Sequence, residues 1–282
     1  MVENSVVERL KSASKLGIAL GGGGARGLAH LGVLKVLDEF GIKPNVVSGT
    51  SFGSIVGAFY CAGHSWKDIA EIMDEVKWHK VLDVSLQGGL IKGDAFGRAL
   101  SKYLPEKFED LEHPLCVIAT NIESGKRVVL SSGDLVRSIR ASACFPGLFA
   151  PVELNGMHLL DGGILDNVPI GALDSYSVDR TVAVNVNIPP DYPVIEEEES
   201  SWWAKLRKKA GLKRASLPFD LLVKSLDIMI EKITSVNMAV SRPDLYIHVP
   251  LFGIRIHNFD KYKEIFEMGE RATREIIESH KK

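Results

Sequence analysis

Short, uniformly apolar runs alternate along this chain with stretches in which apolar residues recur every three or four positions. Runs that are apolar at every position are typical of parallel strands buried on both faces. The expected strands are residues 15–20, 44–49, 114–122, 127–132, 180–187 and 244–250. The expected helices are 28–40, 52–62, 66–76, 95–103 and 135–143. This alternation predicts a three-layer α/β/α fold around a central, mostly parallel sheet.

The last third of the chain departs from this rhythm. Residues 196–214 combine a run of glutamates with two tryptophans and several basic residues, and a long amphipathic stretch follows at 218–240. Residues 259–280 have the pattern of a closing surface helix. Since no repeat and no Gly/Ser-rich linker is visible, we expect an N-terminal extension, 1–14, and one domain, 15–282, with a charged insertion around 190–215 and a helical C-terminal closure.

Composition and charge narrow the function classes. A hydrophobic content of 45% in 282 residues is ample for a buried core. A net charge of −2 and a pI near 6.5 provide no basic field, so we expect no nucleic-acid partner. The first fifteen residues lack the apolar stretch of a signal peptide, and no window reaches the ~20 apolar residues of a membrane span. Three cysteines without CxxC spacing favour free thiols in the cytoplasm over a disulfide framework or a zinc site.

A glycine loop, Gly21–Gly24, separates the first expected strand from the first expected helix. Residues 22–27 satisfy the dinucleotide pattern G-x-G-x-x-G. A dinucleotide site also needs an acidic residue at the end of the second strand, and the sequence there, NVVSGTSFG, contains none. No Gly-Lys-Ser/Thr follows the glycines, which excludes a P-loop. The anion that this loop holds is therefore expected to be of another kind.

The second expected strand runs into Gly49-Thr50-Ser51-Phe52-Gly53, a G-x-S-x-G pentapeptide followed by a helical pattern. Strand, tight turn, serine and helix form a nucleophile elbow, in which the flanking glycines relieve steric clashes. Consecutive strands of one β-α-β unit place the glycine loop and this elbow at the same edge of the sheet. We therefore expect Ser51 to attack an ester carbonyl while backbone N–H groups of the glycine loop stabilise the oxyanion.

Ser51 then needs a proton acceptor. His248 and His257 fit the residue order of an α/β-hydrolase triad, but neither has flanking residues that mark a catalytic loop. Asp161 follows an apolar pair at the end of a hairpin-like run and precedes two glycines. Partial burial at such a position raises the pKa of a carboxylate and makes it a better base. Asp161 is thus the preferred candidate.

Taken together, these motifs resemble the patatin-like phospholipase family. The glycine loop, residues 49–53, the block RASACFPGLFAPV and Asp161-Gly162-Gly163 occur in that family's order and approximate spacing, over roughly 15–186, and Asn167 and Pro169 continue the pattern. The resemblance implies a Ser51–Asp161 dyad without histidine, and an acyl-enzyme hydrolysed by water without metal or cofactor. It also implies an oxyanion motif made of Gly22, Gly23, Gly24 and Arg26, with Gly49 and Gly53 shaping the elbow.

Other prominent residues are expected to have structural roles. Ser142 and Pro146 would shape the pocket wall, Cys144 would be a buried small hydrophobe, and His30 would pack inside the first helix. Apolar positions of the stretch 218–240 are expected to lie in the core, and they could also line a lipid trench. These positions are Leu221, Leu222, Leu226, Met229, Ile233 and Val236, with Ser225 among them.

The expected activity is hydrolysis of carboxylic esters in phospholipids or lysophospholipids. A neutral-lipid or general carboxylesterase and a non-catalytic nucleotide-binding module remain alternatives. Trp202 and Trp203 lie beside basic residues on a short amphipathic stretch, which fits peripheral contact with a membrane. Because Lys209 and Lys213 interrupt the apolar arc, a solvated insertion is an equal alternative for this segment.

Overall fold

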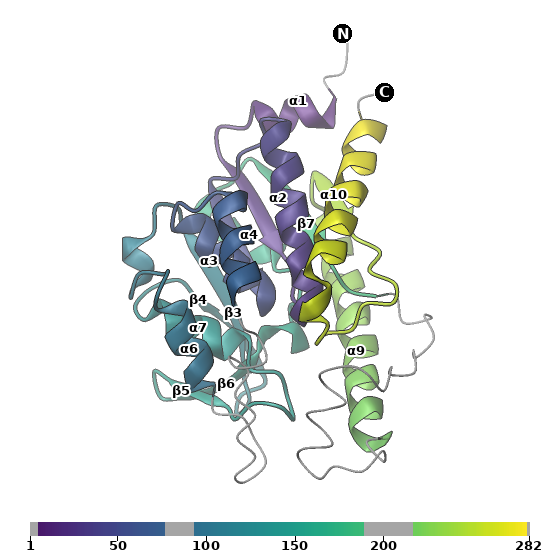
Figure 1. The fold of residues 1–282 in the computed structure, drawn as a ribbon. Helices are drawn as coiled ribbons and strands as arrows, with labels where there is room; N and C mark the ends of the chain where they lie inside the picture. Colours follow the sequence, from purple (N-terminus) through teal and green to yellow (C-terminus); the bar gives the residue numbers. More distant parts are fainter. Residues whose placement is uncertain (1–4, 77–92, 189–216, 281–282) are drawn as a thin grey trace.

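The computed structural model describes residues 5–76, 93–188 and 217–280 (Figure 1). The expected insertion at 190–215, with Trp202 and Trp203, lies outside the described residues. None of the helices that the structure describes combines the length and apolar character that crossing a membrane requires.

An eight-stranded sheet forms the centre of the fold, in the order β5-β6-β3-β2-β1-β7-β8, with β4 also paired to β3. The neighbouring pairs β3–β2, β2–β1, β1–β7 and β7–β8 are parallel. The pairs β3–β4, β3–β6 and β5–β6 are antiparallel. Every residue of β1, β2 and β3 is buried, as their unbroken apolar runs predict. The strands are β1 (Leu16–Leu20), β2 (Val46–Thr50), β3 (Leu115–Asn121), β4 (Lys126–Leu130), β5 (Val152–Leu154), β6 (Met157–Asp161), β7 (Arg180–Asn185) and β8 (Leu245–His248).

One face of the sheet is covered by a layer of α-helices, seen in front of the strands in Figure 1. These helices are α2 (Ala29–Glu39), α3 (Phe52–Cys61), α4 (Trp66–Glu75) and α10 (Tyr262–Ser279). The short helix α7 (Leu135–Ser142) packs beside β3 and β5, and the short helix α6 (Asp94–Leu100) packs against α7. Within the expected extension 1–14, helix α1 (Val6–Lys11) buries Val7 and Leu10 in the main core.

The other face is covered by short 3-10 helices and one long helix. They are η3 (Gly162–Ile164), η4 (Ile170–Ala172), η5 (Asp174–Tyr176) and α9 (Leu217–Ser241). A second buried cluster joins this layer to the sheet: Ala19, Val46, Val168, Ile170, Leu173 and Ala183, with Met238 of α9 packed against it. The predicted three-layer arrangement with a mostly parallel sheet is therefore confirmed.

Most expected strands and helices begin or end one to three residues away from their observed bounds. A 3-10 helix, η1 (Gly24–Leu28), precedes α2, because the glycine loop turns sharply before the α-helix begins. The helix expected at 95–103 ends at Leu100, where turns replace it. The remaining 3-10 helices are η2 (Phe108–Asp110) and η6 (Phe259–Lys261).

The expectation that the apolar positions of α9 lie in the core is wrong for three of them. Leu222, Met229 and Val236 are 42%, 53% and 63% exposed. The opposite face of α9 carries polar side chains that bind loops at the carboxyl edge of the sheet, and this orients the apolar positions outward. Leu226 and Ile233, which lie between the two faces, are half-buried.

Candidate active site

Strand β3 brings the predicted nucleophile and base together. Thr50, the last residue of β2, pairs with Ile118, and Asp161, the last residue of β6, pairs with the next β3 residue, Ala119. Since Ser51 directly follows Thr50, two residues that are far apart in the sequence meet at one point of the sheet edge. The parallel pair β1–β2 brings the glycine loop to the same edge, as predicted.

Ser51 occupies the sharp turn of a strand-to-helix elbow. Its φ of 52° and ψ of −123° are unusual for a residue with a side chain, and a backbone of this kind costs roughly 1–3 kcal/mol. The turn is tight because Gly53 packs against the backbone of β1, where a Cβ atom would overlap the carbonyl oxygen of Leu20. A Cβ atom on Gly49 would similarly lie 2.7 Å from the backbone of Gly53. Both glycines are therefore required at the elbow.

Asp161 is a buried carboxylate in contact with Ser51. Burial raises the pKa of Asp161 to about 6, and hydrogen bonds from the Gly163 N–H and the Ser51 hydroxyl oppose part of this rise. The Gly163 N–H lies 2.8 Å from Oδ1. At neutral pH Asp161 is thus an ionised acceptor for the Ser51 hydroxyl, with a basicity higher than that of an exposed aspartate.

The glycine loop lies against Ser51, since a Cβ atom on Gly22 would be 3.0 Å from the Ser51 Cβ. The Gly22 N–H is occupied by the Asn167 carbonyl at 3.2 Å, and the Ala25 N–H by the Ile256 carbonyl at 2.8 Å. Across the part of the chain that the structure describes, the N–H groups of Gly23 and Gly24 have no acceptor. The three predicted glycines thus divide into one that is already bound and two whose donors are available to an anion.

Arg26, the fourth member of the predicted oxyanion motif, is only 2% exposed. Its Nη2 atom lies 3.2 Å from Oδ1 of Asp227 on α9, and its Nε–H donates to the Gly23 carbonyl at 3.3 Å. The guanidinium is therefore bound to protein groups in this structure, and a direct contact with an oxyanion or a phosphate stays a prediction.

The three histidines considered from the sequence, His30, His248 and His257, lie in different parts of the structure. His30 is fully buried in α2, where burial lowers the pKa of its imidazole to about 4. The ring is therefore neutral, and Nε2–H donates to the Gly21 carbonyl at 2.7 Å. His248 contacts the Asn187 carbonyl with Nε2 at 2.9 Å, and His257 lies in the loop between β8 and η6. Asp161, in contrast, lies close enough to Ser51 for the Ser51 hydroxyl to lower the pKa of the carboxyl.

Cys144 is buried next to the predicted dyad. Burial and the nearby charge of Asp161 raise the pKa of its thiol to about 12, so the thiol is not ionised at neutral pH. Its Sγ donates to the Ala150 carbonyl, and its own carbonyl accepts the Asp161 N–H at 3.0 Å. The side chain has the environment expected of a small buried hydrophobe.

Two contributors to the site were not assigned these contacts from the sequence. Ser142, expected in the pocket wall, accepts a 2.8 Å hydrogen bond from the Ser51 N–H through its buried hydroxyl. Asn167, noted only as part of the family pattern, binds Gly22. The only signal in the sequence is their place in the blocks RASACFPG and DGGILDNVP, because the contacts join residues 91 and 145 positions apart.

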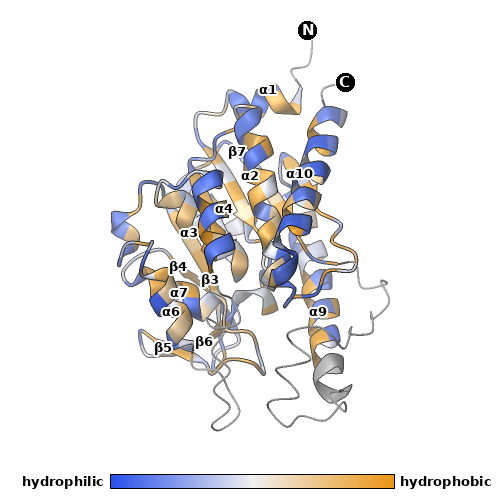
Figure 2. Ribbon diagram, in the orientation of Figure 1, coloured by the Kyte–Doolittle hydropathy of each residue, from blue (hydrophilic) through white to orange (hydrophobic). Residues whose placement is uncertain are grey.

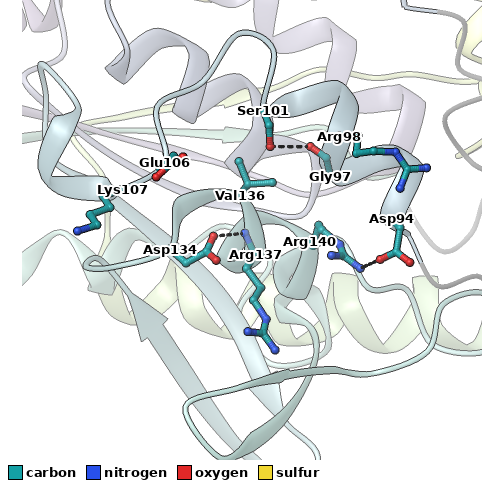
Figure 3. A pocket seen from close by; sticks show the side chains of 10 residues that line it. All are labelled: Asp94, Gly97, Arg98, Ser101, Glu106, Lys107, Asp134, Val136, Arg137 and Arg140. Carbon is teal, nitrogen blue, oxygen red and sulfur yellow. Dashed lines mark hydrogen bonds and ion pairs between the residues drawn. The ribbon is translucent and has the colours of Figure 1, made fainter.

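A separate surface cavity of about 540 Å³ lies between α6 and α7 (Figure 3). Helix α7 turns Val136, Arg137 and Arg140 toward it, while Ser142 on another side of the helix reaches Ser51. An ion pair of 2.9 Å between Arg140 and Asp94 closes one end. None of the predicted site residues lines this cavity. Among the described residues, no cluster of three or more His, Cys, Asp or Glu side chains is placed to hold a metal ion.

Comparison with known proteins shows the family of the chain. Residues 18–174 match the family model of the patatin-like phospholipases. The chain belongs to this family. Lysophospholipase NTE1 of Kluyveromyces lactis is 30% identical over 276 residues, which cover 93% of the chain and 19% of that protein. An uncharacterized NTE family protein of Mycobacterium bovis is 35% identical over 183 residues, covering 64% of the chain and 51% of that protein.

Among solved structures, VipD from Legionella pneumophila superposes with a TM-score of 0.60 at 17% identity, over 94% of this chain and 67% of VipD. At that identity the likeness concerns the fold alone. This patatin-like chain spans only a fifth or less of the length of the lysophospholipases it matches, 19% in the Kluyveromyces protein and 16% in the Saccharomyces cerevisiae one.

Proposed function

We propose that this chain hydrolyses carboxylic ester bonds of phospholipids or lysophospholipids through a Ser51–Asp161 dyad and an acyl-enzyme. The observation that carries the proposal is the strand register that brings Ser51, at a strained elbow, to the buried Asp161 carboxylate, whose pKa the Ser51 hydroxyl lowers. Membership of the patatin-like phospholipase family and similarity to proteins named lysophospholipases support the substrate class.

In the proposed reaction, the Ser51 oxygen attacks the ester carbonyl while Asp161 accepts the hydroxyl proton. The negative charge that develops on the carbonyl oxygen is stabilised by the N–H groups of Gly23 and Gly24. Asp161 then returns the proton to the departing alkoxide, which leaves the acyl group on Ser51. Water, deprotonated by Asp161, attacks the acyl-enzyme, and the Ser51 oxygen recovers the proton as the fatty acid leaves.

The substrate would come from a bilayer or a micelle, which extends the proposal to peripheral contact with a lipid surface. The expected contact through Trp202 and Trp203 lies outside the described residues. Within them, α9 supports such contact, because it exposes Leu222, Met229, Val236 and Val240 on one face and meets Arg26 and η3 with the other. A neutral-lipid or general carboxylesterase is the second candidate, and a panel of esters that differ in head group separates the two.

All three cysteines are free, which supports a reducing compartment such as the cytoplasm.

Covalent labelling tests the dyad directly. A fluorophosphonate probe is expected to label the wild-type protein and not Ser51→Ala, and Asp161→Asn should lose turnover while His248→Ala and His257→Ala retain it. Because Asp161 must be ionised to act, kcat/KM should fall about tenfold per pH unit below a pKa of about 6. Equal labelling of wild type and Ser51→Ala would show that Ser51 is not the nucleophile. Activity lost only in a histidine variant would favour a catalytic triad with that histidine as the base.

A further inference from the structure

Both polar groups of the Gly22 backbone, its N–H and its carbonyl, are hydrogen-bonded to a single residue, Asn167. We propose that Asn167 is a positioning residue that aims the Gly23 N–H at the developing oxyanion. This inference rests on the proposed function, because it assigns a role within that same site. The inference extends the proposed function, because it gives a part in catalysis to a side chain outside the dyad and the glycine loop.

Asn167 is buried and makes two hydrogen bonds to Gly22. Its main-chain carbonyl accepts the Gly22 N–H at 3.2 Å, and its side-chain Nδ2–H donates to the Gly22 carbonyl at 3.3 Å. Since both polar groups of the Gly22 backbone are bound by the same residue, the loop cannot rotate there without breaking one of the two bonds.

The direction of the next N–H follows from peptide geometry. In a trans peptide the C=O and N–H bonds point in opposite directions, and the described chain contains no cis peptide bond. Holding the Gly22 carbonyl toward Asn167 therefore directs the Gly23 N–H away from Asn167, where no described residue accepts it. The next peptide repeats this arrangement, because the Gly23 carbonyl accepts from the backbone N–H and Nε–H of Arg26 and so directs the Gly24 N–H the opposite way.

Asn167 also connects the oxyanion donors to the base. A Cβ atom would lie 2.7 Å from Asn167 Oδ1 if added to Gly22, and 2.8 Å if added to Gly163, whose N–H binds Asp161. The carboxamide thus fits between the glycine loop and the loop that carries the base. Asp166, the preceding residue, is anchored to β2 by the Thr50 hydroxyl, which donates to its carbonyl at 2.8 Å. Asn167 therefore sets the spacing between the oxyanion donors and Asp161.

The test is a split between kcat and KM in Asn167→Ala. Complete loss of an oxyanion donor typically costs 10²- to 10³-fold in kcat, so misdirecting one is expected to lower kcat by roughly 10- to 100-fold. KM for a short-chain ester should stay within about twofold, because the ground-state ester carries no oxyanion. Fluorophosphonate labelling of Ser51 should slow by the same factor as kcat/KM, since phosphonylation also places negative charge in the oxyanion site.

Asn237→Ala is the matched control. Asn237 also donates its carboxamide to this loop, to the Leu165 carbonyl at 3.4 Å and to Asp166 Oδ1 at 3.3 Å, but it has no hydrogen bond to Gly22. Its kcat is expected to stay within about twofold of wild type, so a loss equal to that of Asn167→Ala would overturn the proposal. Asn167→Ser, whose side chain is too short to reach the Gly22 carbonyl, repeats the test with a polar residue.

The remaining outcomes are decisive as well. If Asn167→Ala raises KM and leaves kcat unchanged, or if it retains wild-type kcat, Asn167 does not aim an oxyanion donor, although the dyad can still be correct. If neither Asn167 variant folds, the residue is structural and the positioning role is rejected. If Ser51→Ala retains full activity, it is the proposed function that fails.

Discussion

Helices α9 and α10 follow one another in the last third of the chain, and they are oriented in opposite senses. Helix α10 turns its apolar residues toward the protein, where Ile265 and Ile277 are completely buried, and presents hydrophilic residues outward (Figure 2). Helix α9 turns polar residues toward the protein and leaves Met229 and Val236 exposed. One helix is therefore held by burial and the other largely by polar contacts.

The contacts beneath α10 are close and apolar. It crosses α2 where Gly269 and Gly32 face the backbone of the opposite helix, and a Cβ atom on either glycine would overlap that backbone. Ion pairs join α10 to α2 through partly exposed side chains, such as the pair of 2.7 Å between Lys35 and Glu270. None of the predicted site residues lies on α10 itself, although α10 also contacts η1, which carries Gly24 and Arg26.

The polar contacts beneath α9 reach residues of the candidate active site. Asp227 binds Arg26 of the oxyanion motif, and Asn237 binds the loop between Asp161 and Asn167. Among the residues that the structure describes, a small apolar cluster with Met238 at its edge adds to these bonds. Such an inverted helix is expected to contribute less to the free energy of folding than α10. Substitutions in the two helices should therefore differ in how much stability they cost.

The crossing of α10 and α2 gives the largest expected effect. Gly269→Ala should lower the free energy of unfolding by about 4 kcal/mol or more, because its Cβ forces the two helix backbones apart. Gly171→Ala is the matched control on the α9 side, where an added Cβ has no atom closer than 3.7 Å. Urea unfolding of both variants measures the difference. Similar stabilities would mean that the helices can separate at little cost, and that the α10 layer is not close-packed.

A second comparison pairs two isoleucines that differ in burial. Ile277→Ala on α10 removes a completely buried side chain and should cost about 3 kcal/mol. Ile228→Ala on α9 removes a side chain that is 38% exposed and should cost about 1 kcal/mol or less. Thermal and urea unfolding report both values. If the two losses were equal, the contrast between a helix held by burial and one held by polar contacts would be wrong.

Much of this arrangement could be predicted because its causes are local. Uniform apolar runs predict buried strands, and the β1-α2-β2 unit places the glycine loop and Ser51 at one edge wherever such a unit forms. The meeting of Ser51 with Asp161 is implied by the resemblance of the motifs to the patatin-like phospholipase family. Its geometric cause, the pairing of β2 and β6 with consecutive residues of β3, depends on a register that no local pattern specifies.

The orientation of α9 was not predictable in this way. Its periodicity predicts an amphipathic helix, and apolar faces are ordinarily turned inward. The side that faces the protein here is set by partners distant in the sequence, such as Arg26, which lies 201 positions before Asp227. The same reason hides the contacts of Ser142 and Asn167, because a hydrogen bond between distant segments leaves no periodic trace in the sequence.

Substitutions on the exposed face of α9 give the smallest expected effect on stability. Their main expected effect is on binding to a lipid surface. Met229→Ser and Val236→Ser together should change the free energy of unfolding by less than about 0.5 kcal/mol per site, because both side chains are already exposed. Hydrolysis of a soluble short-chain ester should be unchanged, since neither residue contacts the dyad. Sedimentation with phospholipid vesicles should fall, because each serine removes apolar surface available to the lipid. Unchanged vesicle binding would show that this face does not contact lipid, and it would leave the ester hydrolase proposal standing. Ile277→Ser, at a completely buried position, serves as the control that shows how a loss of folding stability affects the same measurements.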